Sequence, residues 1–545
     1  MNPSRTPIQS CLLGGLVRLL IVFAVIVVGV FAALIYMGVL PPKMAKSNSP
    51  TPTTQVTSTV TRIATNTPLP TGTSVTPCCI VDNTGIGMSD GAYAFDTNRI
   101  DGQLKIQAAD ALKQGDITTA QSLWDQAIAQ DSNDAEAFIY KEDQRILASH
   151  SPYITLVVGT MLSGNSSDIS AGRDDLQGAY IAQKQFNDGF QLNGGVQVRL
   201  LIANSGGQAQ DATNVAQKIV DAAKQDKTIV GVMGWPFSEQ TLDAVNILTN
   251  AHIPMVSSTA SSDALTGISS FFFRVCPSNQ IQAVAGAHYA EQQLKAKRVV
   301  LFVDPNNSYS QSLAQDFSNQ FTTDGGQIVQ TENYTVGTPA GLPTLLQDAL
   351  SYNPDLIYFS GYADDMGVLL TDLQTTDPNL QIMGGDALYE IRAYPKTAHA
   401  NYHRLRFTSF AFPDEWQILG YQNPPFFDTY AGTFDPTRAH LHDPYGYIRP
   451  DSDVMLSYDA TLALLQASHN ALANANTSLT PDELQQSLKA LTGTQAVQGL
   501  SGQISFGSDG NPLNKTVVIL SVDADGFTQL AKNDIEGCFL NGKCG

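Results

Sequence analysis

The sequence predicts an α/β protein of two doubly wound lobes, each a parallel sheet between layers of helices, with a hinged cleft between the lobes. Two observations support this prediction. After Pro152, apolar runs of strand length alternate with helical stretches, and such alternation builds parallel sheets covered on both faces. Eight strand-like runs are too many for one sheet of the Rossmann size. Two lobes, joined by crossovers near residues 273–277 and 407–413, therefore fit the chain better than one.

Each expected strand is a short apolar run, and each expected helix repeats its apolar residues with the period of an α-helix. The expected strands are residues 153–159, 196–203, 228–234, 254–256, 298–304, 326–334, 355–360 and 380–384. The expected helices are residues 174–188, 211–225, 238–250, 280–294, 310–323, 342–351 and 364–375. We expect lobe 1 to comprise about residues 151–275 and 412–500, lobe 2 about residues 276–411 and 501–530, and a C-terminal tail residues 531–545.

The N-terminal region reads as a membrane anchor followed by a stalk. Residues 19–40 are 22 residues without a charge, which as a helix reach about 33 Å, enough to cross the hydrocarbon of a bilayer. A cleavable signal peptide has a shorter apolar region, so we favour an uncleaved transmembrane helix after a cytoplasmic tail of residues 1–18. Residues 41–77 form a Thr- and Pro-rich stalk that cannot bury a core. This order predicts a single-pass protein of the cell membrane with its main domain extracytoplasmic.

Residues 78–150 are expected to form a small helical segment. Its stretch ALKQGDITTAQSLWDQAIAQDSNDAEAFIYK resembles one tetratricopeptide repeat, with small residues at Ala120 and Ala127 and a large one at Trp124. A single repeat cannot bury its apolar face alone. Two interpretations are open: a helical hairpin packed on the neighbouring domain or on another copy of itself, and a peptide-binding groove.

Composition excludes several classes of partner and cofactor. The chain has 30 Lys and Arg against 50 Asp and Glu, a formal net charge of -20, which disfavours nucleic acid and anionic lipid. Its six cysteines are scattered, and no Cys or His spacing suggests zinc, so we expect no metal and no cofactor. Cys538 and Cys544 enclose a short loop, and both a disulfide and two free thiols remain open there. Motifs of nucleophile-elbow, zinc-protease and Walker type are absent from the sequence, so we expect no enzyme.

Loops that follow the expected strands carry the candidate binding residues. In doubly wound sheets, ligands bind at the carboxyl ends of the strands. In lobe 1, Ser238 is expected to cap the helix after residues 228–234, and a run of small hydroxyl residues occupies 257–262. In lobe 2, Tyr362 and Asp386 follow two other strands. One wall offers hydroxyl and N–H donors and the other a carboxylate and a phenol, an arrangement that suits a zwitterion.

From about residue 153 to residue 525 the chain resembles the type I periplasmic binding proteins of the leucine/isoleucine/valine-binding class, the solute receptors of ABC importers. The resemblance rests on IVGVMGWPFSEQTLDAVNILTNAHIPMVSSTASSDALT, the crossover FFFRVCPSNQIQAVA, the segment VVLFVDPNNSYSQSLAQDF and the pair DLIYFSGYADDMGVLL and IMGGDAL. It implies that Ser238 and Ser261 contact the ligand's carboxylate, with Thr259 and Ala260 beside it through the backbone. It also implies that Tyr309 and Tyr362 lie against the ligand and that Asp386 holds the ammonium.

The resemblance implies a membrane-anchored solute-binding protein that closes on an amino acid or a similar small zwitterion and docks on an ABC permease. The alternative is a receptor ectodomain that reports ligand closure to a membrane partner without transport. A third possibility, an extracellular enzyme on the same two lobes, would need a nucleophile and a base in the cleft, and the sequence offers no such constellation.

Overall fold

The computed structural model describes residues 79–189, 191–373, 380–472, 478–531, 538–540 and 543–544, all within the compact unit Gly72–Gly545. The predicted transmembrane helix 19–40 and nearly all of the stalk and tail predictions lie outside these described residues. In the described ranges, every helix falls short of the length or the hydropathy that a membrane span requires.

The first lobe is built on a seven-stranded sheet with the strand order β1-β2-β4-β3-β5-β6-β7. Strands β3 to β7 pair in parallel, whereas the hairpin β1-β2 adds to β4 in antiparallel. The strands are β1 (Cys79–Val81), β2 (Gly87–Ser89), β3 (Tyr153–Thr160), β4 (Gln197–Asn204), β5 (Ile229–Gly234), β6 (Met255–Ser257) and β7 (Phe272–Arg274). Its helices include α5 (Ser166–Asp188), α6 (Ala209–Gln225), α7 (Ser238–Asn250), α14 (Ser452–Ala471) and α15 (Pro481–Lys489).

The second lobe has its own seven-stranded sheet, ordered β16-β15-β12-β11-β10-β8-β9. Strands β8 to β12 pair in parallel, and β15 and β16 close one edge in antiparallel. The strands are β8 (Arg298–Val303), β9 (Gln327–Asn333), β10 (Leu356–Ser360), β11 (Gln381–Gly384), β12 (Leu405–Ser409), β15 (Val518–Val522) and β16 (Thr528–Leu530). The helices are α8 (Asn279–Gln292), α9 (Ser308–Thr323), α10 (Leu342–Ser351) and α11 (Ala363–Asp372).

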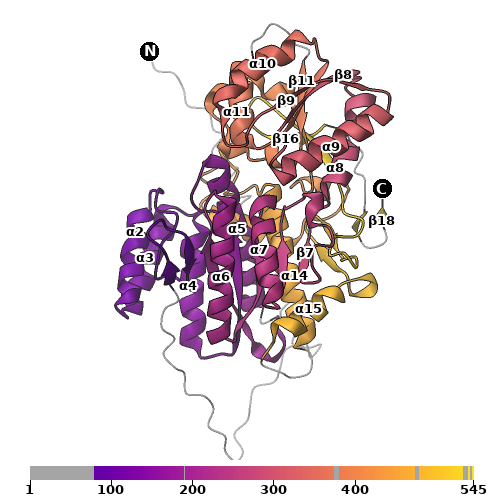
Figure 1. Cartoon of the computed structure of the whole chain (residues 1–545). Helices are drawn as coiled ribbons and strands as arrows, with labels where there is room; N and C mark the ends of the chain where they lie inside the picture. Colours follow the sequence, from indigo (N-terminus) through magenta and orange to yellow (C-terminus); the bar gives the residue numbers. More distant parts are fainter. Residues whose placement is uncertain are drawn as a thin grey trace, which may run out of the picture. The chain divides into compact units, whose positions relative to one another are not determined.

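The two-lobed α/β prediction is therefore confirmed, and Figure 1 shows α10, α11, β8 and β9 gathered in one lobe and α5, α6 and α7 in the other. The chain passes between the lobes after β7, after β12 and before β15. The region after β12 adds α12 (Glu415–Ile418), α13 (Pro425–Phe434) and the hairpin of β13 (Val497–Gly499) and β14 (Gly502–Ile504). Near the C-terminus, β17 (Cys538–Leu540) pairs with β18 (Lys543–Cys544). That register sets Cys538 opposite Cys544 in the backbone, and the disulfide between them stays a prediction.

The N-terminal segment is part of the first lobe. Its three helices, α2 (Gly102–Lys113), α3 (Ile117–Gln130) and α4 (Ala135–Ser149), share one apolar core with that lobe, to which the fully buried Trp124 and Tyr140 contribute. The segment is not purely helical as predicted, because its first residues form β1 and β2 at the edge of the lobe 1 sheet. Of the two interpretations of its amphipathic helices, packing on the neighbouring domain is the one that the core favours. The resemblance to a tetratricopeptide repeat stays a prediction.

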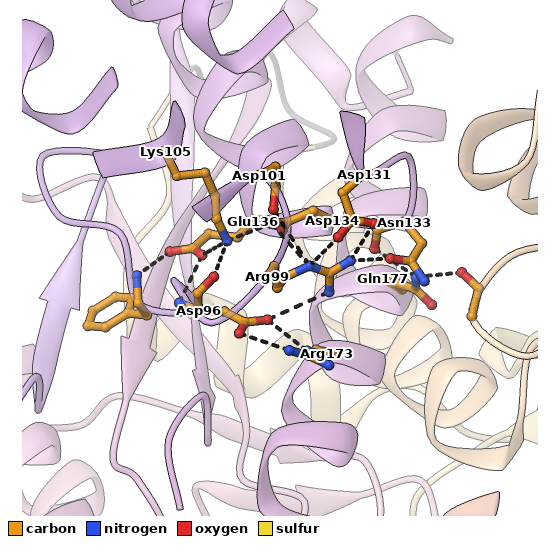
Figure 2. Close-up of polar contacts among 12 residues, drawn as sticks. Asp96, Arg99, Asp101, Lys105, Asp131, Asn133, Asp134, Glu136, Arg173 and Gln177 are labelled. Carbon is orange, nitrogen blue, oxygen red and sulfur yellow. Dashed lines mark hydrogen bonds and ion pairs between the residues drawn. The ribbon is translucent and has the colours of Figure 1, made fainter. Parts of the chain in front are cut away.

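A buried ion cluster holds the N-terminal segment together (Figure 2). Lys105 Nζ lies 2.5 Å from Asp134 Oδ2 and 2.7 Å from Glu136 Oε2, and its side chain is fully buried. Arg173 of α5 donates to both carboxylate oxygens of Asp96, at 2.7 and 3.0 Å, and so ties the segment to the lobe. Charges removed from water at this depth are stable only when they are paired. Lys105 is the cation that pairs with Glu136, while Arg99 pairs with Asp96, Asp101, Asp131 and Asp134.

We expect Lys105→Met to lower the free energy of unfolding by about 3–5 kcal/mol, because it leaves Glu136 buried without its cation and leaves Asp134 with Arg99 alone, at 3.5 Å. The matched control is Lys113→Met on the same helix, whose half-exposed ammonium makes only a surface pair and whose loss should change stability by less than about 1 kcal/mol. Urea denaturation followed by circular dichroism measures both. Equal unfolding midpoints for the two variants would contradict this role.

Candidate functional site

A cavity of about 20 Å³ is here called the inner cavity. It is surrounded by the loops at the carboxyl ends of β5, β6 and β11 and by the N-terminal ends of α9, α11 and α14. Five predicted binding residues line it: Ser238, Thr259, Tyr309, Tyr362 and Asp386. Both lobes contribute, because the strand ends of the two sheets face each other here.

The lobe 1 wall consists mainly of the first turn of α7 and the loop after β6. Ser238 is the first residue of α7 rather than its N-cap, which is Phe237, so the capping prediction is wrong. Ser238 Oγ accepts a hydrogen bond from the backbone N–H of Ser262 at 3.1 Å, and its own proton can be donated to a ligand. Thr259 Oγ1 donates to the carbonyl of Pro236 at 2.9 Å and so presents lone pairs to the cavity.

Ala260 and Ser261, the other two predicted residues, do not line the inner cavity. The backbone turns after Thr259, so that Ala260 is packed in the apolar core of lobe 1 and its N–H donates to Ser257 Oγ at 3.2 Å. Ser261 Oγ accepts from Gln282 Nε2 at 3.4 Å. Neither residue lines the closed cavity, and their contact with a ligand stays a prediction.

The lobe 2 wall holds a buried carboxylate. Asp386 Oδ1 accepts hydrogen bonds from Gln282 Nε2 at 2.7 Å and from Tyr309 Oη at 3.0 Å. Thr408 fixes the orientation of Gln282 by donating to its Oε1 at 2.6 Å. Burial raises the pKa of Asp386 to about 6, against the hydrogen bonds from Gln282 and Tyr309, which lower it. Asp386 has neutral hydrogen-bond donors around it, and the inner cavity has no Lys or Arg in its lining.

Aromatic rings and cross-lobe hydrogen bonds close the mouth of the inner cavity. The rings of Phe237 and Tyr362, one from each lobe, lie 4.6 Å apart between centroids. The backbone N–H of Ser167 in α5 donates to Asp364 Oδ2 in α11 at 2.7 Å. Glu239, whose charge could have faced a bound carboxylate, instead accepts from the backbone N–H of Ser308 at the start of α9. Negative charge at a helix N-terminus is favourable, so these contacts hold the lobes together.

Outside this mouth lies a larger cleft of about 870 Å³, here called the outer cleft. Phe237 and Tyr362 line both spaces and separate them. Six carboxylate side chains and no Lys or Arg line the outer cleft; the six are Asp168, Asp211, Glu239, Asp304, Asp364 and Asp365. Burial and the charge of Asp364 raise the pKa of Asp168 to about 6. The cleft that adjoins the inner cavity at Phe237 and Tyr362 is therefore strongly acidic.

Phe237, Glu390 and Asp453 line the inner cavity although the sequence analysis did not select them. Phe237 lies in the WPFS loop, directly before a residue that was selected. Glu390 lies just after the motif IMGGDAL and Asp453 lies in the first turn of α14, and both residues lie outside the motifs that carried the resemblance. Within the described ranges, no group of three or more His, Cys, Asp or Glu is arranged to hold a metal ion.

Known proteins resemble part of the chain. An amino acid binding protein of Pseudomonas aeruginosa is 26% identical over 235 residues, which cover 43% of this chain and 61% of that protein. A Leu/Ile/Val-binding protein of Rhizobium johnstonii is 29% identical over 198 residues, or 36% of this chain and 51% of the relative. The matches thus span little more than half the length of these relatives. Their names are those of binding proteins, in agreement with the expectation that the chain is not an enzyme.

The fold is also that of solved structures. The crystal structure of a leucine-binding protein from Thermotoga maritima superposes with a TM-score of 0.56 at 24% identity, and the match covers 70% of this chain and 97% of that one. The family model described as periplasmic binding protein matches residues 154–527, well over half of the sequence. The chain therefore belongs to the periplasmic binding protein family.

Proposed function

We propose that this chain is an extracytoplasmic, membrane-anchored solute-binding protein of an ABC importer, which holds an amino acid or a similar small zwitterion in the inner cavity. One observation carries the proposal. The hydroxyl of Ser238 and the N-terminus of α7 on lobe 1 face the buried carboxylate of Asp386 on lobe 2 across a single cavity. A ligand carboxylate suits the first wall and a ligand ammonium the second.

Binding requires the two walls to separate and close again. A cavity of about 20 Å³ has room for about one water molecule, and an amino acid is several times larger. The chain passes between the lobes at three places, and bending there opens the cleft without unpacking either core. Re-formation of the Phe237–Tyr362 contact and of the Ser167–Asp364 hydrogen bond then stabilises the closed state.

The names of the relatives support an amino acid as the ligand, and the 22 uncharged residues at 19–40 support the anchor. In this proposal the closed form docks on an ABC permease in the same membrane. The alternative, a receptor that signals without transport, draws on the same closure.

A thermal-shift screen of the full chain against the twenty amino acids tests the proposal. A ligand at about 100 times its dissociation constant stabilises the folded state by about 2.7 kcal/mol, which raises the unfolding temperature measurably. We expect at least one amino acid to do so. A flat response across all twenty would contradict the proposed function.

Asp386→Asn should weaken binding of any amino acid found in that screen by about 2 kcal/mol or more, roughly thirtyfold in Kd, because it removes the buried partner of the ammonium. The control is Asp221→Asn, an exposed carboxylate on α6 far from the cleft lining, which should leave Kd unchanged. Isothermal titration calorimetry measures both, and equal Kd values for the two variants would remove Asp386 from the site.

The same carboxylate predicts a pH dependence. Because burial raises the pKa of Asp386 to about 6, a proton occupies it in the free protein below that pH and must leave before an ammonium can pair. We expect nearly constant affinity from about pH 8 to pH 7, then a fall that approaches tenfold per pH unit below about pH 6. Calorimetry of one neutral amino acid across this range measures the effect, and a flat profile would speak against an ionised Asp386 in the complex.

A further inference from the structure

The inner cavity contains more carboxyl groups than the single ammonium of a neutral amino acid can pair. Asp386, Glu390 and Asp453 all line it, together with three aromatic rings and no Lys or Arg. A zwitterion with an apolar side chain brings a single ammonium, which Asp386 can pair. Two carboxyl groups would then remain in the cavity without a cationic partner from the ligand.

Among the described residues Glu390 forms no salt bridge, although a hydrogen bond with Ser170 and the charge of Arg392 lower its pKa. Its side chain is 5% exposed, and its buried Oε2 has no hydrogen-bond partner among the described residues. Arg392, only two residues away, forms its salt bridges with Asp174, and with Asp451 at 3.8 Å. A buried carboxylate oxygen without a donor is costly, and a cationic ligand group is one way to satisfy it.

The acidic groups around Glu390 come from several elements. Asp174 and Asp175 lie on α5, and Asp451 and Asp453 lie at the start of α14. Burial, followed by the charge of Asp451, raises the pKa of Glu390 to about 7. Burial and the charges of Glu390 and Asp451 likewise raise the pKa of Asp453 well above its usual value. A proton therefore occupies Glu390 in part near neutral pH, and a bound cation would displace it.

The route into the cavity has the same electrical character. The outer cleft is lined by six carboxylates and by no Lys or Arg. A cleft lined with one sign of charge concentrates ligands of the opposite sign and speeds their association. At the mouth, the faces of Phe237, Tyr362 and Tyr309 offer further favourable contacts to a cation.

We propose that the cleft selects an amino acid whose side chain carries a second positive charge, with Asp386 holding the α-ammonium and Glu390 and Asp453 holding the side-chain cation. The inference rests on the proposed function, because it assumes that an amino acid occupies the inner cavity. It departs from the aliphatic ligands that the names of several relatives state.

Calorimetry of the full chain with lysine and norleucine tests the inference, since the two ligands share a carbon chain and differ in the terminal ammonium. A charge-assisted hydrogen bond in a buried site corresponds to roughly ten- to hundredfold in Kd, so lysine should bind at least tenfold more tightly. The protein should release more protons when it binds lysine than when it binds norleucine. The number of protons is measured from the binding heats in two buffers of different ionisation enthalpy. Norleucine or leucine binding as tightly as lysine would overturn the inference while leaving the proposed function intact.

Two further ligands separate the inference from the proposed function. If another amino acid binds but lysine and arginine do not, the inference is overturned and the proposed function stands; if none of the twenty amino acids binds, the proposed function itself fails. Cadaverine, which is lysine without its carboxylate, should bind more weakly than lysine. Cadaverine binding as tightly as lysine would overturn the amino acid as the ligand class, and with it this inference.

Variants of Glu390 and Asp453 give a second, independent measurement. Glu390→Gln and Asp453→Asn should each weaken lysine binding roughly ten- to hundredfold and leave norleucine binding unchanged or stronger. The matched control is Asp110→Asn, an exposed carboxylate on α2 outside both cavities, which should change neither Kd. Circular dichroism confirms that each variant is folded. Unchanged lysine affinity in both folded pair variants would overturn the assignment.

Discussion

The carboxyl ends of two parallel sheets meet across one small cavity, and every contact proposed for the ligand depends on that meeting. Ser238 follows β5 in one lobe and Asp386 follows β11 in the other, and only closure of the lobes brings them to the same space. Phe237 and Tyr362 seal this space, and the backbone N–H of Ser308 binds Glu239 beside it. Ligand recognition and domain closure are therefore one event, because neither lobe alone supplies both charges.

Burial gives the cavity its chemical character. Asp386 is surrounded by the neutral donors Gln282 and Tyr309, and Glu390 has a buried oxygen without a donor, so the folded protein holds acids that water can scarcely reach. Such groups keep protons or find cations. The ion cluster around Lys105 shows the other solution, in which the chain itself supplies the cation. In our proposal the ligand supplies the cation that the lining of the inner cavity does not.

Much of the fold follows from the hydrophobic period of the sequence. All eight expected strands and six of the seven expected helices occur within a few residues of their predicted bounds. The exception is α5, which starts earlier than predicted because Asn165 forms a capping box at its N-terminus. Helix α14 escaped prediction since it is buried on nearly all sides and has no polar face. The rule that ligands bind at the carboxyl ends of parallel strands identified Asp386 and Tyr362. It could not find Glu390, which lies beyond the loop that directly follows β11, or Asp453, which reaches the cavity only through the return of the chain to lobe 1.

The account's central claim is that one amino acid bridges the two walls. A crystal structure of the full chain with lysine bound tests this claim most directly. The account predicts the α-ammonium within hydrogen-bond distance of Asp386, the carboxylate at Ser238 and the first turn of α7, and the side-chain ammonium at Glu390 and Asp453. A ligand that contacts only one lobe, or that leaves Asp386 bonded to Gln282 and Tyr309 alone, would contradict it.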